Sequence, residues 1–286
     1  MGTTMLELVS SHACHGGEQR FYRHESKTIG LPMKFSVYLP PQAARGRVPA
    51  LFYLAGLTCT DETFAIKAGA QRFAAQHGVA LVAPDTSPRG ALVPGEADAW
   101  DFGVGAGFYL DATEAPWSAH WRMESYVAGE LREIAAAELP IDGARLGIFG
   151  HSMGGHGALV LALRHPDVYR SVSAFAPIAA PSRCPWGEKA FSGYLGADRE
   201  AWQQHDASEL VARAGAKRFA EGILIDQGLA DPFLATQLNP DVFEAACRAA
   251  GQPLTLRRHA GYDHGYYFIS TFIADHIEHH ARVLGR

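Results

Sequence analysis

The chain has 286 residues, a net charge of −5 and 48% hydrophobic residues, a size that suits one large α/β domain or two small ones. There is no long basic run, so nucleic acid is not an expected partner. No apolar stretch approaches the roughly 18 residues that a membrane-spanning helix needs, so no contact with a membrane is expected.

Residues 4–40 are expected to form antiparallel strands, followed by strands that are buried on both faces. The strands predicted in this half span residues 21–26, 33–39, 48–54 and 79–83. The first two alternate apolar and polar residues, whereas the last two are nearly continuous apolar runs. A helix should begin near Thr60 or Asp61 and run to about Gln76. Residues 85–117 form a long irregular segment, and a loop of this length usually has a function.

The second half alternates strands and helices. The expected strands span residues 146–149, 171–176, 222–226 and 254–259, and the expected helices 117–138, 153–164, 240–250 and 265–284. Residues 177–216 are expected to form an insertion with short helices. This alternation favours a mostly parallel central sheet with helices on both faces. We see no repeat, low-complexity tract or linker, so the prediction is a single domain over residues 1–286.

Residues 150–154 read Gly-His-Ser-Met-Gly between a predicted strand and a predicted helix. In this setting the Gly-x-Ser-x-Gly pattern is typical of a nucleophilic serine, here Ser152, on a sharp strained turn. The glycines let strand and helix approach each other, and the helix N-terminus directs free N–H groups to the same place. A glycine-rich turn can also be only a turn, so the chain must supply further partners.

A serine hydroxyl needs a base, and the base needs an orienting acid. On such sheets these groups follow strands, in the chain order serine, acid, histidine. Asp231 lies in a loop and is the favoured acid, whereas Asp226 is the last residue of a strand and is expected to be structural. Asp231 could equally cap a helix that begins at Pro232. His264, in the loop after the last strand, is the favoured base, and His259 is the second choice.

Two backbone N–H groups are needed to stabilise the oxyanion of an acyl-transfer intermediate. We expect them from Met153, which follows the serine, and from Leu57, in the turn after the strand over residues 48–54. His276, His279 and His280 are expected to face solvent on the last helix. A metal site needs a convergent set of ligands, so neither a metal nor another cofactor is expected.

Several segments together closely resemble S-formylglutathione hydrolase, the family also called esterase D, over essentially the whole chain. These segments are residues 54–60, 83–90, 103–117, 150–157 (GHSMGGHG), 184–187 (CPWG), 261–264 (GYDH) and 266–268 (YYF). The resemblance implies an α/β-hydrolase fold and hydrolysis of the thioester S-formylglutathione to glutathione and formate, with side activity on simple esters. It also implies a cytosolic location and a homodimer. One departure is Ala55, where many members of the family have serine.

By motif, the resemblance assigns Ser152, Asp231 and His264 as the triad and the Leu57 and Met153 amides as the oxyanion donors. Cys59 matches a cysteine near the pocket that is not the nucleophile. From the residues alone, Cys59 could be a small apolar filler or a reactive thiol.

A cytosolic protein also fits the cysteines and the N-terminus. Cys14, Cys59, Cys184 and Cys247 are scattered and form no Cys-x-x-Cys pair, so a structural zinc site is not expected and reduced thiols are. Residues 1–10 lack the pattern of a secretory signal.

Glutathione carries two carboxylates, so lysine or arginine should contact it. Arg89, Lys67 and Lys189 all lie in suitable segments and the sequence does not choose among them. Three aromatic residues are expected either to wall the pocket or to pack in the core: Trp100, Phe108 and Trp186. Two rival functions remain, a carboxylesterase acting on oxygen esters and a non-catalytic binding protein of the same fold.

Overall fold

The structure is a computed structural model that describes residues 6–214 and 218–285. Nine strands in these residues form one sheet, in the order β1-β2-β3-β5-β4-β6-β7-β8-β9. The strands are β1 (Glu7–Cys14), β2 (Gly17–Glu25), β3 (Pro32–Leu39), β4 (Val48–Leu54), β5 (Ala80–Pro84), β6 (Ile141–His151), β7 (Tyr169–Phe175), β8 (Ile223–Gly228) and β9 (Leu254–His259).

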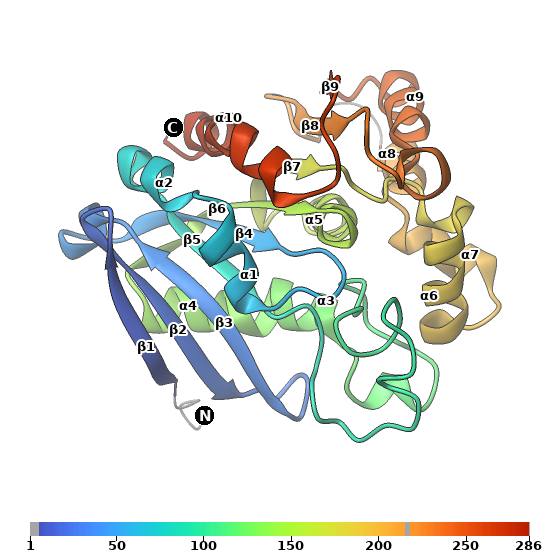
Figure 1. Ribbon diagram of the computed structural model, residues 1–286, viewed down its shortest axis with the longest axis horizontal. Helices are drawn as coiled ribbons and strands as arrows, with labels where there is room; N and C mark the ends of the chain where they lie inside the picture. The colour runs from blue at the N-terminus through green and yellow to red at the C-terminus, as the bar shows by residue number, and fades with distance from the viewer. Residues whose placement is uncertain (1–5, 215–217, 286) are drawn as a thin grey trace.

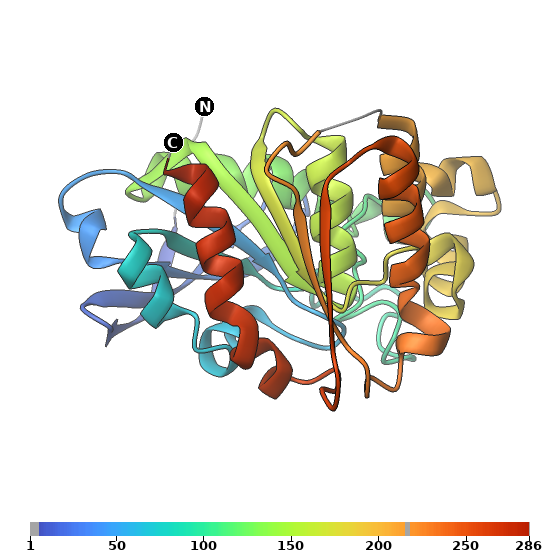
Figure 2. The ribbon, with the colours of Figure 1, turned by 90° about the horizontal axis from the view of Figure 1, so that it is seen from above.

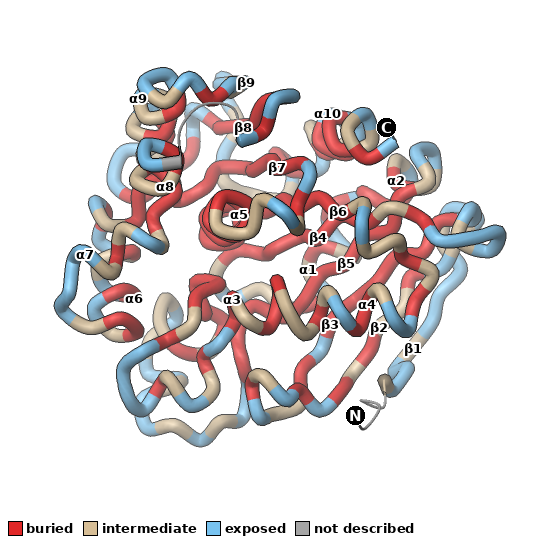
Figure 3. The backbone as a smooth tube through the Cα atoms, turned by 180° about the vertical axis from the view of Figure 1, so that it is seen from behind, coloured by how far each residue is buried: buried red, intermediate tan, exposed pale blue. Residues whose placement is uncertain are grey.

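The sheet changes from antiparallel to parallel along its width. β1, β2, β3 and β5 pair antiparallel, and every pair from β5 and β4 to β9 is parallel. This confirms the predicted mostly parallel sheet with antiparallel N-terminal strands. The inner parallel strands β4, β5, β7 and β8 are almost entirely buried, whereas the edge strands β1 and β9 are exposed or only partly buried (Figure 3).

Helices cover both faces of the sheet (Figures 1 and 2). The α-helices are α1 (Asp61–Lys67), α2 (Gln71–His77), α3 (Met123–Ser125), α4 (Arg132–Glu138), α5 (Met153–Arg164), α6 (Pro185–Leu195), α7 (Arg199–Trp202), α8 (Ala207–Ala214), α9 (Pro240–Ala250) and α10 (Tyr266–Leu284). α1, α2 and α10 pack on one face, and α4 and α5 on the other, with α8 against α5 and α9 against α8 and β9.

Two predicted helices are interrupted. The helix predicted from residue 61 to 76 is the separate helices α1 and α2, because the chain takes a left-handed conformation at Gly69 (φ +65°) between them. The helix predicted over residues 117–138 begins as the 3₁₀ turn Trp117–Ala119 and contains the π-helical segment Tyr126–Leu131 between α3 and α4.

The prediction that His276, His279 and His280 face solvent is wrong, since all three are buried. α10 lies against the sheet, and β7 offers these rings polar partners. His280 hydrogen-bonds Ser171 (2.6 Å) and Ser173 (2.9 Å), and His276 bonds Ser173 (2.8 Å). Within residues 6–214 and 218–285, no group of three or more His, Cys, Asp or Glu side chains is placed to hold a metal ion. No helix in that part of the chain is long and apolar enough to cross a membrane.

Candidate active site

The Gly-x-Ser-x-Gly segment forms a sharp turn between β6, which ends at His151, and α5, which begins at Met153. Ser152 itself has φ +58° and ψ −121°. A non-glycine residue held in this conformation costs on the order of 1–3 kcal/mol, and such strain clusters at functional sites. A Cβ added to Gly154 would lie only 1.9 Å from the Leu54 carbonyl oxygen. The turn therefore depends on glycine at this position.

Replacing Gly154 by alanine is expected to destabilise the fold by more than about 3 kcal/mol, because neither backbone can move away without disturbing β4. Thermal unfolding measures the effect. Gly46→Ala is the matched control, since a Cβ at Gly46 would meet no atom within 4 Å. Equal melting temperatures for the two variants would contradict the close packing of this turn.

Two backbone amides beside Ser152 are free to donate. A Cβ at Gly56 would lie 3.2 Å from the Ser152 Cβ, so the turn after β4 packs directly on the serine turn. In the part of the chain that the structure describes, the N–H groups of Leu57 and Met153 donate to no protein acceptor. By contrast, the Ser152 N–H donates to the Phe175 carbonyl at 3.0 Å. The arrangement suits an oxyanion bound next to the serine hydroxyl.

Asp231 and His264 come from the loops after β8 and β9 and meet through a 2.5 Å contact between Oδ2 and the ring Nδ1. The other carboxylate oxygen accepts a hydrogen bond from the Phe233 N–H at 2.8 Å. Gln227 also donates to Asp231, at 3.3 Å. Asp231 thus contacts the histidine ring and also stabilises the turn that follows it. The alternative role, capping a helix that begins at Pro232, is not what the structure shows, because the helical segment begins at Leu234 and no side chain caps it.

Ser152 and His264 line the same cavity, of about 130 Å³, together with Gly56, Leu57 and Cys59. Ser152 is only 3% exposed, so this cavity is the route to its hydroxyl. Among the described residues the hydroxyl makes no hydrogen bond to the His264 ring. Bonds of this kind are often long before substrate binds and tighten in the complex.

Asp226, the alternative acid, lies between β8, β9 and α10. Its carboxylate is fully buried and binds Arg257 (2.5 and 2.6 Å), His259 (3.1 Å) and His276 (3.2 Å). Burial alone would raise the pKa of Asp226, but the hydrogen bonds from His276 and Arg257 outweigh it and hold the pKa below its usual range. Neither Asp226 nor His259 lines the cavity beside Ser152.

Aromatic rings wall the cavity. The ring of Trp186 lies 5.5 Å from that of Trp100 and 4.8 Å from that of Phe233, and Phe233 lies 4.9 Å from His264. The sequence left open whether Trp100, Phe108 and Trp186 wall the pocket or pack in the core. Trp100 and Trp186 line the cavity, whereas Phe108 is fully buried in the core.

His151 is a cavity residue that sequence reasoning missed. Its ring centre lies 4.4 Å from that of His264, and neither of its ring nitrogens has a hydrogen-bond partner among the described residues. Burial lowers the pKa of His151 well below its usual value, so the ring is neutral at pH 7. Its place directly before the serine was the only signal available.

Cys59 also lines the cavity. Burial raises the pKa of its thiol, which disfavours the reactive thiolate at neutral pH. This property agrees with a packing role for Cys59 more than with a reactive thiol.

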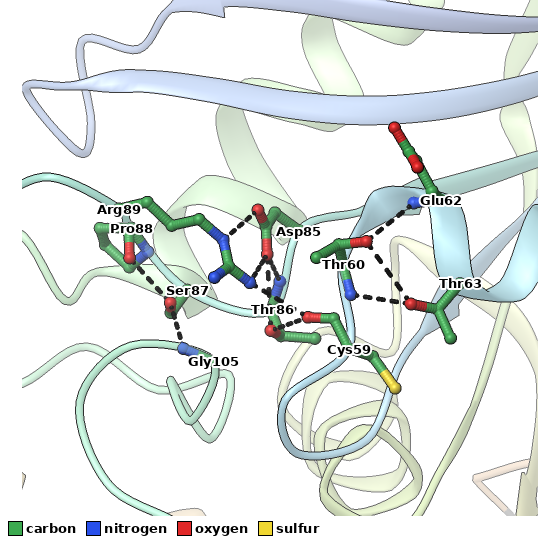
Figure 4. A network of polar contacts seen from close by, with 10 residues as sticks. All are labelled: Cys59, Thr60, Glu62, Thr63, Asp85, Thr86, Ser87, Pro88, Arg89 and Gly105. Carbon is green, nitrogen blue, oxygen red and sulfur yellow. Dashed lines mark hydrogen bonds and ion pairs between the residues drawn. The ribbon is translucent and has the colours of Figure 1, made fainter. Parts of the chain in front are cut away.

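The three basic residues proposed for glutathione differ in their surroundings. Arg89 binds Asp85 through two contacts of 2.7 and 2.9 Å and also donates to the Cys59 carbonyl (Figure 4). The Lys189 ammonium is paired with Asp101. Lys67 lies over the Tyr266 ring, 5.8 Å from its centre.

Comparison with known proteins places the whole chain in a family. The family model described as "Putative esterase" matches residues 26–279. The chain is 55% identical to a mouse S-formylglutathione hydrolase over 280 residues, 98% of this chain and 99% of that protein. It is 52% identical to an Arabidopsis thaliana S-formylglutathione hydrolase, covering 99% of each chain. A solved structure of an S-formylglutathione hydrolase from Agrobacterium tumefaciens superposes with a TM-score of 0.94 at 49% identity, covering 97% of this chain and 99% of that one.

Proposed function

The chain belongs to the esterase family that contains the S-formylglutathione hydrolases, and we propose that Ser152, His264 and Asp231 carry out its chemistry. The reaction is the hydrolysis of S-formylglutathione to glutathione and formate, with side activity on short-acyl esters. The observation that supports the residue assignment best is the Asp231–His264 contact of 2.5 Å at a cavity that Ser152 also lines.

In the first half of the reaction, His264 takes the proton of the Ser152 hydroxyl as its oxygen attacks the formyl carbon. The oxyanion accepts hydrogen bonds from the Leu57 and Met153 amides. Asp231 holds the ring tautomer and stabilises the imidazolium. The carbon–sulfur bond then breaks, and glutathione leaves as its thiol with the proton from His264.

In the second half, His264 removes a proton from water, which attacks the formyl-serine. The bond between the acyl carbon and the Ser152 oxygen breaks, formate is released, and the proton returns to the serine. His151, neutral beside His264, adds no positive charge that would oppose formation of the imidazolium.

The cavity predicts a preference for the smallest acyl groups. Its volume of about 130 Å³ is well below the roughly 300–1,000 Å³ of drug-sized ligand pockets. We expect kcat/KM to fall from S-formyl- to S-acetyl- to S-butyrylglutathione, by at least about tenfold over the series, because each methylene must displace packed aromatic rings. A 4-nitrophenyl ester series of the same acyl groups is the control for the leaving group.

Higher activity on S-butyrylglutathione than on the formyl thioester would contradict this preference. The same panel separates the rival carboxylesterase function, which requires oxygen esters to have the larger specificity constants. Labelling with a fluorophosphonate probe tests the other rival, since a non-catalytic binding protein would form no adduct on Ser152.

The enzyme is proposed to act in the cytoplasm, as a homodimer of single-domain subunits. All four cysteines are unpaired, which fits a reducing compartment. Cell fractionation tests the location, and sedimentation over a range of concentrations tests the dimer. A chain that sediments as a monomer at micromolar concentration would contradict the dimer.

A further inference from the structure

Of the three basic residues that the sequence left as alternatives, two are occupied by ion pairs. Arg89 is held by Asp85 and borders a different cavity, next to β2 and β3. Lys189 is held by Asp101. A carboxylate of the substrate would have to compete with these acidic partners for either cation.

Lys67 has no such competitor. It is the last residue of α1, its side chain is exposed, and in the described part of the chain its ammonium forms no ion pair or hydrogen bond. It lies over the face of the Tyr266 ring. An ammonium in this setting is free to accept an anion without losing an existing salt bridge.

Tyr266 connects Lys67 to the cavity. The Tyr266 ring lines the cavity together with Ser152 and His264, so the Lys67 ammonium lies one aromatic ring away from the cavity. Cys59 also lines the cavity, and the Lys67 ammonium is close enough to affect its thiol. Burial raises the pKa of that thiol, and the positive charge of Lys67 opposes the rise.

The sulfur of glutathione is on its central residue, and a carboxylate lies on each side of it. An extended chain covers about 3.5 Å per residue. A cation that lies one aromatic ring away from the cavity is therefore within reach of a substrate carboxylate when the thioester is at Ser152. We infer that Lys67 binds a carboxylate of the glutathione moiety at the rim of the cavity. This inference rests on the proposed hydrolysis of S-formylglutathione.

The test compares Lys67→Gln with Lys67→Arg and with the matched control Lys189→Gln. Two substrates are used, S-formylglutathione and 4-nitrophenyl acetate, which carries no carboxylate. Lys67→Gln should raise KM for S-formylglutathione by about 3- to 10-fold, the range expected for one partly exposed charge-assisted contact, with kcat nearly unchanged. Lys67→Arg should restore KM, and Lys189→Gln should behave as wild type.

Two further measurements distinguish charge recognition by Lys67 from a merely structural role: KM for the aryl ester, and the salt dependence of kcat/KM. KM for 4-nitrophenyl acetate should be the same in wild type, Lys67→Gln and Lys67→Arg. The wild-type kcat/KM for S-formylglutathione should fall as salt rises, and this dependence should flatten in Lys67→Gln because the screened charge is gone.

Two results would overturn the inference. One is an unchanged KM for S-formylglutathione in Lys67→Gln, and the other is an equal loss on both substrates, which would indicate a packing defect at Tyr266. Failure of the proposed function looks different, because wild-type protein would then hydrolyse the aryl ester but not S-formylglutathione. S-Formylglutathione amidated at its glycine identifies which carboxylate is bound: a KM that no longer responds to Lys67→Gln points to the glycyl carboxylate.

Discussion

Ser152→Ala is expected to lower kcat toward S-formylglutathione by about 10⁵- to 10⁶-fold, the loss typical of removing a serine nucleophile. The methyl group cannot form the acyl intermediate, and His264 then has no proton to take. The oxyanion amides remain, so a residual rate above that of the uncatalysed reaction should persist. Steady-state kinetics at high concentrations of the variant measures this residual activity.

Folding of the Ser152→Ala protein is checked by its thermal unfolding, which should resemble that of wild type. Ser270→Ala is the matched control, because Ser270 is exposed on α10 and its hydroxyl bonds, among the residues that the structure describes, only the Tyr267 carbonyl. It should keep full activity and full labelling by a fluorophosphonate. Near-wild-type turnover in Ser152→Ala would refute the proposed nucleophile.

Much of the fold follows from local patterns in the sequence. β4, α5, α9 and β9 begin and end at the predicted residues, because a continuous apolar run or a helical period meets a clear boundary at each end. The break at Gly69 was harder to foresee, since a single glycine is tolerated inside many helices. The backbone turns there because α1 and α2 pack at different places along the sheet.

The buried histidines of α10 show a limit that is set by tertiary contacts. Ser171 and Ser173 satisfy His276 and His280 from β7, more than a hundred residues away in the chain. A histidine beside other polar residues looks like a surface residue until such partners are known. The sequence pattern alone therefore favoured the wrong face.

The candidate site likewise has parts that the sequence predicts and parts that depend on tertiary contacts. The Gly-x-Ser-x-Gly motif, loop position and chain order together were enough to choose Ser152, Asp231 and His264, because strand ends gather at one edge of a parallel sheet. Chain order says nothing about side chains that reach the cavity from the middle of a motif, as His151 does. Nor can it tell which cation is already paired, and so the choice of Lys67 required coordinates.

Asp231→Asn should lower kcat by about 10⁴-fold and leave the fold largely intact, because the amide can hold the His264 ring in the wrong tautomer. Asp226→Asn should instead lower stability and leave kcat largely intact. It removes the charge that pairs with Arg257 and should cost about 2–4 kcal/mol of unfolding free energy, below the upper range for buried pairs because the Arg257 side chain is 31% exposed. Its kcat should stay within a few-fold of wild type.

Measuring kcat and thermal stability on both variants distinguishes the two carboxylates, since each is expected to move only one of the two quantities strongly. The contrast rests on geometry: Asp231 contacts a ring that lines the cavity, whereas Asp226 contacts side chains beneath α10. A stable but inactive Asp226→Asn protein beside an active Asp231→Asn protein would exchange the two roles. In that case His276 or His259, the rings bound to Asp226, would have to reach Ser152, and neither lines its cavity.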